Sequence, residues 1–149
     1  MTAFVTAGAG FLVAVLWFDL MFDSQVRGQG QAELPVDVRY SIAAYYRRVT
    51  TEARPGGRLV AAVMLITIAA LAGEVARGQV DAWIGWTSLV LASFGVGLAA
   101  ARTVRQAVRL GTQEDGPEHQ SELARAIFFD HCVCFAALTA VVVLQLLPR

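Results

Sequence analysis

The sequence has few charged residues and contains no lysine at all. Only 16% of its 149 residues are charged, whereas roughly a quarter are charged in an ordinary soluble domain. Without lysine, a Schiff-base or lysine-nucleophile mechanism is excluded. Twelve arginines balance twelve acidic residues, so no net positive charge favours nucleic acid as a partner.

Common catalytic motifs are also missing. The chain contains no Gly-rich phosphate loop, no HExxH, no nucleophile elbow and no CxxC. Its two cysteines, Cys132 and Cys134, are two positions apart in an apolar run that we expect to be helical. Side chains at that spacing diverge on a helix, so we expect no disulfide between them. No arginine precedes the first apolar run, which we therefore interpret as a retained helix rather than a secretory signal.

Hydrophobic residues are abundant, at 56% of the chain. They gather in runs of about twenty, the length that a helix needs to cross roughly 30 Å of hydrocarbon. We therefore predict an all-α integral membrane protein, a single four-helix bundle over residues 1–149. The expected spans are residues 4–22, 59–76, 82–101 and 126–147. The second follows the breaker Pro55-Gly56-Gly57, and the fourth ends before Pro148.

The arginines indicate how the four spans are oriented. Because consecutive spans alternate in direction, the long loops between residues 22–59 and 102–125 lie on the same side of the membrane. That side carries ten of the twelve arginines, and only Arg77 and Arg149 lie on the other. Loops rich in arginine stay in the cytoplasm. We therefore predict cytoplasmic long loops, with both termini outside the cytoplasm.

The first long loop contains a helical pattern. Val38, Ile42, Tyr45 and Val49 recur at helical spacing, while Tyr46 and the arginines fall on other faces. This pattern predicts an additional amphipathic helix at the cytoplasmic membrane interface.

The second long loop begins with a basic stripe. Arg102, Arg105 and Arg109 are spaced as on one face of a helix, so we expect the third span to continue beyond the bilayer. Gly111 is the predicted end of this extension, because glycine commonly terminates helices. A turn is expected over residues 114–117.

Small residues predict how the last two spans pack. Helices in lipid associate through close approach, which small residues permit. The pairs with four-residue spacing in the third span are Ser93 with Gly97, Gly97 with Ala101, and Gly95 with Ala99. In the fourth span Cys132, Ala136 and Ala140 have the same spacing. We expect these faces to pack within one chain or in a homodimer.

Ionisable residues gather at the cytoplasmic ends of the first and fourth spans. Asp19 and Asp23 lie one helical turn apart, and Asp130 is followed by His131. A carboxylate at a helix centre costs about 3 kcal/mol on insertion scales, and less near the interface, so each requires a partner. The predicted partners are the nearby arginines Arg47, Arg48, Arg102 and Arg105. Two interpretations stay open: a structural ion-pair network, or a pocket for a cation, a proton or a polar head group.

His131 is also a candidate metal ligand. Cys134 lies one turn further along the same span, and imidazole with thiolate suits copper or zinc. A tetrahedral site would need further donors from another helix or subunit. A bis-histidine haem would need a second chain, because the other histidine, His119, lies in the charged loop. The sequence requires no cofactor.

One segment of the fourth span resembles a known family. Residues 128–134 read F-F-D-H-C-V-C, similar to the F-x-x-H-G-x-S pattern of the transmembrane protein 205-like four-helix proteins. The Leu16-Trp17 and Tyr45-Tyr46 pairs also fall where that family has aromatic residues. Cysteines replace the glycine and serine of the pattern. The resemblance implies a four-helix membrane domain of poorly defined function, with His131 as the residue most worth testing.

A second group, the anthrone oxygenase-like membrane proteins, is similar in plan. That resemblance would imply oxygenation without a cofactor, but no motif in this chain selects it. From the residues themselves we expect a non-enzymatic protein, either an accessory or assembly subunit of a membrane complex or a small-molecule-binding membrane module. Its expected partners are the lipid bilayer and other membrane subunits or a second copy.

Two functional alternatives remain. The first is a membrane enzyme, or a protein that handles metal or haem, built on the Asp19, Asp23, Asp130 and His131 cluster. The second is a small-solute transporter that uses the same carboxylates. Both would place function at the cytoplasmic end of the bundle.

Overall fold

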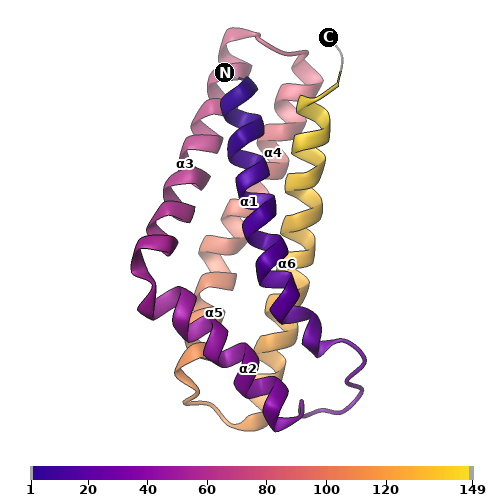
Figure 1. The fold of residues 1–149 in the computed structure, drawn as a ribbon. Coiled ribbons are helices and arrows are strands. Elements are labelled where there is room, and N and C mark those ends of the chain that lie inside the picture. Colours follow the sequence, from indigo (N-terminus) through magenta and orange to yellow (C-terminus); the bar gives the residue numbers. More distant parts are fainter. Residues whose placement is uncertain (1, 148–149) are drawn as a thin grey trace.

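A computed structural model describes residues 2–147 of the chain as an assembly of helices (Figure 1). The α-helices are α1 (Thr2–Asp23), α2 (Val36–Arg47), α3 (Arg54–Arg77), α4 (Ala82–Leu98), α5 (Val104–Thr112) and α6 (Pro117–Gln145). Short turns of 3-10 or π-helix extend three of them: η1 (Ser24–Val26), η2 (Arg48–Glu52) and η3 (Ala99–Thr103). Pro148 and Arg149, on which part of the prediction fell, lie outside the described residues.

The prediction of four membrane spans is confirmed. Four helical stretches are long and apolar enough to cross a bilayer: Thr2–Val26, Pro55–Arg77, Ala82–Thr112 and Pro117–Gln145. Large apolar side chains such as Trp17, Leu65 and Phe94 are exposed on their outer faces. Because lipid is as apolar as these side chains, such exposure suits a bilayer and not water. The chain is an all-α, multi-pass membrane protein.

The four long helices stand side by side, and α2 lies across one end of them (Figure 1). Around the bundle α1 packs against α3 and α6, and α4 packs against the same two helices. Helix α2 packs mainly against α5, the extension of α4. One apolar cluster fills the bundle between the spans, and a second joins α2, α5 and the first half of α6.

The predicted amphipathic helix is present as α2. Ile42 and Tyr46, one turn apart, are buried together with Ala43. Val38 and Tyr45 pack against the same cluster and are partly buried. The prediction that Tyr46 faces away from the apolar side was wrong, because α2 buries a broader face than one row of residues.

The helix ends differ from the predicted ones. The predicted continuation of the third span is present: it ends at Thr112, one residue after Gly111, and Gln113 adopts the left-handed conformation with φ of 57°. Gly111 instead permits a close crossing, since a Cβ there would lie 2.8 Å from the backbone nitrogen of Arg47. Helix α6 already begins at Pro117, nine residues before the predicted start of the fourth membrane span at residue 126. Proline suits the first turn of a helix, where its missing N–H has no partner to lose.

The predicted break before the second span, at Pro55-Gly56-Gly57, is wrong. Pro55 lies at the start of α3 rather than in a break before it, and Gly56 and Gly57 continue the helix. A second close crossing joins α1 to α3, where a side chain at Gly8 would collide with Thr67 Oγ1.

The small-residue faces were predicted only in part. Ser93 and Gly97 are exposed, as is Ala136 of α6, so these rows do not form the contact between α4 and α6. Gly95 does face α6, and the Cys134 thiol donates to its carbonyl oxygen over 3.6 Å. The contact therefore includes Gly95 of the predicted rows, but not Ser93, Gly97 or Ala136.

The crossing of α2 and α5 gives a first prediction. Gly111→Ala should lower the free energy of unfolding by about 1–3 kcal/mol, because its Cβ has no room beside the Arg47 backbone. Gly97→Ala is the matched control, since nothing lies within 4 Å of a Cβ there. Thermal unfolding in detergent measures both. Equal stability of the two variants would contradict the described crossing.

Candidate functional site

A hydrogen-bonded group of side chains lies where α2 meets the end of α1 and the middle of α6. Asp23 is fully buried and accepts a 2.7 Å hydrogen bond from the Tyr46 hydroxyl. Its other oxygen lies 2.7 Å from Nδ1 of His131. One carboxylate thus joins three helices, because Asp23 ends α1, Tyr46 belongs to α2 and His131 to α6.

Asp19 has a similar partner one turn earlier in α1. The Tyr45 hydroxyl donates to its carboxylate over 2.6 Å, and the Tyr45 ring stacks on Phe22 with ring centroids 4.0 Å apart. Burial raises the pKa of Tyr45, and the charge of Asp19 raises it further. Burial followed by the charge of Asp23 raises the pKa of Tyr46 in the same way. Both hydroxyls therefore stay protonated and act as donors at neutral pH.

Asp130 faces a different part of the bundle. Its side chain is buried, and one oxygen accepts a 3.1 Å hydrogen bond from the Thr103 hydroxyl. Nε of Arg102 lies 3.4 Å from the same oxygen, with the arginine side chain half exposed. Asp130 therefore anchors α6 to η3, whereas the next residue, His131, points to α1 and α2.

The structure separates the predicted arginines from the carboxylates of α1. Arg102 contacts Asp130 rather than Asp19 or Asp23, and Arg47 pairs with Glu52 over 3.4 Å on the surface. Within residues 2–147, Arg48 and Arg105 form no ion pair with any acidic side chain. Hydroxyl donors avoid the large desolvation penalty of burying an arginine. Sequence reasoning paired charge with charge and therefore missed the tyrosine partners.

A cavity of about 630 Å³ opens beside this group. It lies among α1, α3, α4 and α6, and most of its lining is apolar. Its polar lining comes mainly from Asp19, Tyr45, Tyr46, Thr50, Thr103 and His131. The lining also includes Leu59 of α3 and Val104 of α5, which are both about half exposed. The cavity therefore reaches the surface between those two helices.

The candidate metal ligands do not form a metal site within the described chain. His131 bonds to Asp23, whereas the Cys134 thiol bonds to the carbonyl of Gly95. Residues 2–147 contain no group of three His, Cys, Asp or Glu side chains placed to hold a metal ion. Cys132 and Cys134 are both free thiols, as their spacing predicted.

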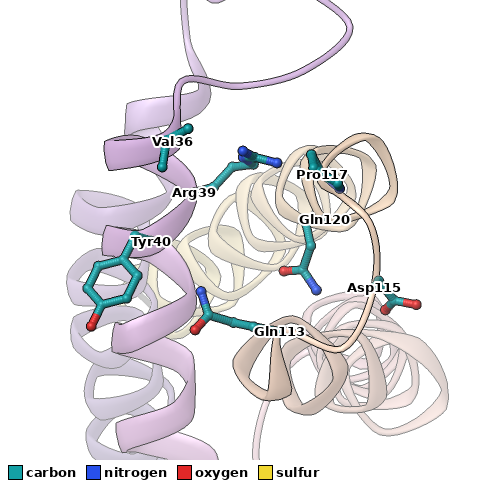
Figure 2. A pocket seen from close by; sticks show the side chains of 7 residues that line it. All are labelled: Val36, Arg39, Tyr40, Gln113, Asp115, Pro117 and Gln120. Carbon is teal, nitrogen blue, oxygen red and sulfur yellow. The ribbon is translucent and has the colours of Figure 1, made fainter.

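A smaller pocket of about 200 Å³ lies between α2 and the turn that joins α5 to α6 (Figure 2). Arg39 extends from α2 toward Pro117, and Gln120 points into the space between the helices (Figure 2). Asp115, at its rim, forms a two-point ion pair with Arg109, which lowers the pKa of the Asp115 carboxyl. This pocket is shallow, and the buried side-chain atoms on it that have no hydrogen-bond partner, Arg39 Nε and Gln120 Nε2, are both donors.

Fold and site together define a small four-span membrane protein with an apolar cavity that ends in a buried Asp–His–Tyr group. Comparison with known proteins finds no matching family model, no matching curated protein and no matching solved structure. The resemblance to four-helix families therefore depends on residues 128–134 and a few aromatic positions. His131, which that resemblance singled out, lies in the candidate site.

Removing the hydroxyl of Tyr46 should destabilise the fold more than removing that of Tyr45, because their carboxylate partners are buried to different extents. Tyr46→Phe leaves the fully buried Asp23 without one donor and should lower the free energy of unfolding by about 1–3 kcal/mol. Tyr45→Phe should lower it less, because Asp19 is only partly buried. Tyr40→Phe, on an exposed side chain, is the control and should change nothing. Unfolding in detergent measures this order, and a neutral Tyr46→Phe would be inconsistent with it.

Proposed function

We propose that this chain is a small-molecule-binding module of the membrane, whose cavity holds one lipophilic molecule by its polar end. The observation that carries the proposal is the cavity itself. Its volume of about 630 Å³ lies within the roughly 300–1,000 Å³ of ordinary ligand pockets. Such pockets are mainly apolar with a few placed polar groups, and this lining has that character.

The polar end of the cavity favours a ligand that donates hydrogen bonds. Nδ1 of His131 is held by Asp23, so Nε2 is the ring nitrogen left for a ligand, with a lone pair when the ring is neutral. Asp19 accepts one hydrogen bond from Tyr45 and keeps further acceptor capacity. A hydroxyl, phenol or amine on an otherwise apolar molecule matches these acceptors.

We propose that the ligand enters the cavity from the lipid bilayer. The lining reaches exposed Leu59 and Val104, two apolar residues on long helical stretches that include candidate membrane spans. A lipophilic ligand dissolved in the bilayer would therefore enter sideways between α3 and α5. The excess of arginine in the loops near α2 supports a cytoplasmic position for the polar end and external termini.

One observation favours a second candidate, a membrane enzyme. A carboxylate that holds Nδ1 of a histidine and leaves Nε2 for a substrate is the arrangement of a general base. A bound phenol or alcohol would then lose a proton to His131. Chemical change of a ligand during incubation would favour this enzyme, whereas unchanged ligand favours a binding module.

Filling the cavity tests the proposed function. Val60 of α3 lines the cavity and is partly buried, so Val60→Trp should abolish binding of an alkylphenol probe. Val90→Trp is the matched control, because Val90 is 63% exposed on α4 and does not line the cavity. Native mass spectrometry of the protein in mild detergent measures the bound fraction. Equal binding by both variants would contradict the assignment.

His131 should contribute to affinity through its free ring nitrogen. His131→Phe removes a hydrogen bond worth about 1.4 kcal/mol or more, so the dissociation constant of the alkylphenol should rise about tenfold. His119→Phe is the control, since His119 lies in the first turns of α6, where it is partly exposed and pairs with Glu122, and it does not line the cavity. If instead the protein copurifies with larger subunits and binds no probe, the accessory-subunit alternative is favoured.

A further inference from the structure

A second buried carboxylate lies at the other end of the bundle. Glu74 of α3 is 0% exposed, and neither of its side-chain oxygens accepts a hydrogen bond from any described residue. Helix α3 ends three residues later at Arg77, at the end of the bundle away from α2 (Figure 1). Buried polar groups are almost always partnered, so this carboxylate requires an explanation.

Two polar side chains from other helices lie at the level of Glu74. Ser88 of α4 is fully buried, and Gln145 of α6 is 5% exposed and donates to the Ser88 hydroxyl over 3.4 Å. A Cβ on Gly85 would lie 3.0 Å from Val75, which places the residue after Glu74 beside the turn that contains Ser88. The three side chains therefore form one layer across the bundle.

An apolar layer lies directly inside this polar one. Leu71, Ala92 and Val141 each precede or follow a member of the polar layer by three or four residues, and all three belong to the core of the bundle. That core separates Glu74 from the Asp23 and His131 group. The polar layer is thus a distinct feature and not a part of the site beside α2.

The unpartnered atoms of the layer are all oxygens. They are both carboxylate oxygens of Glu74 and the amide oxygen of Gln145, whose NH₂ group is occupied by Ser88. Oxygen ligands of this kind bind hard cations, and the Ser88 hydroxyl adds a further acceptor. Because the buried carboxylate oxygens of Glu74 accept no hydrogen bond from the described residues, the set favours a positively charged ligand.

The charges around the layer limit that ligand to a single positive charge. Helix α4 has no charged residue, and the charged residues of α1, Asp19 and Asp23, lie at the opposite end. On α6 the ionisable residues nearest in sequence, Cys134 and His131, are also toward the other end, and Arg77 on α3 is exposed. One carboxylate neutralises one positive charge, whereas a divalent cation would leave a net charge in the membrane, which is costly.

We propose that Glu74, Gln145 and Ser88 form a binding site for one monovalent cation, either a proton or Na⁺. The site joins α3, α4 and α6 at the end of the bundle that is away from α2. It is independent of the proposed small-molecule cavity. In other membrane proteins, carboxylates that are buried among the helices also bind protons or Na⁺.

Carbodiimide labelling tests this site directly. Dicyclohexylcarbodiimide is apolar and reacts with a protonated carboxyl group, so in the full chain in mild detergent it should label Glu74, faster as the pH falls. Peptide mass spectrometry locates the label. Slower labelling in NaCl than in choline chloride identifies Na⁺ as the ligand, whereas labelling that depends on pH but not on Na⁺ identifies a proton.

Two outcomes would overturn the proposal. The first is that Glu74 is labelled in denaturing detergent but is not labelled at any pH in the folded chain. The second is labelling of the folded chain that responds neither to pH nor to Na⁺. Gln145→Leu provides a check that keeps the carboxylate: it should change the pH or Na⁺ dependence, while Val143→Leu, on an exposed face, should not. Identical behaviour of these variants would also exclude the proposed site.

Discussion

The structure depends on one requirement, that a carboxylate buried among membrane helices be hydrogen-bonded. Asp23 meets this requirement through Tyr46 and His131, and in doing so ties α1 to both α2 and α6. Helix α2 does not cross the membrane, yet its position at the end of the bundle is fixed by these buried bonds and by its close crossing with α5 at Gly111. Tyr46 and His131 also line the cavity.

Much of this fold could be predicted from the sequence. Four apolar runs with few charges specify four spans, and the helical spacing of Val38, Ile42 and Tyr45 specifies α2. Hydropathy reports only which residues suit lipid, so it could not locate helices that continue into water. The early start of α6 at Pro117 was missed for that reason, whereas the arginine stripe predicted the continuation of the third span to within one residue of its end at Thr112.

The candidate site was predicted in its acidic residues but not in its partners. Asp19, Asp23, Asp130 and His131 stood out because charged and ionisable groups are rare in membrane spans. Tyr45 and Tyr46 did not, because an aromatic residue near an interface has an ordinary role as an anchor. Which neutral donor meets a buried acceptor depends on how α2 folds back, and that is a tertiary contact with no local pattern in the sequence.

The buried carboxylates at the two ends of the bundle differ in their hydrogen-bond partners. Asp23 has its donors within the chain, so its role is to fix helices and to orient His131. Glu74 has none among the described residues, which favours a ligand from outside. An apolar core lies between them. The cavity and the cation site are therefore separate proposals, and either can fail without the other.

The central claim is that Asp23 holds Nδ1 of His131 and leaves Nε2 facing the cavity. Nitrogen NMR of the protein with isotope-labelled histidine measures this directly, with His119→Gln used to assign the signals. The account predicts that Nδ1 stays protonated at every pH at which the chain is folded, and that only Nε2 titrates. A neutral ring of His131 with its proton on Nε2 and none on Nδ1 would contradict it.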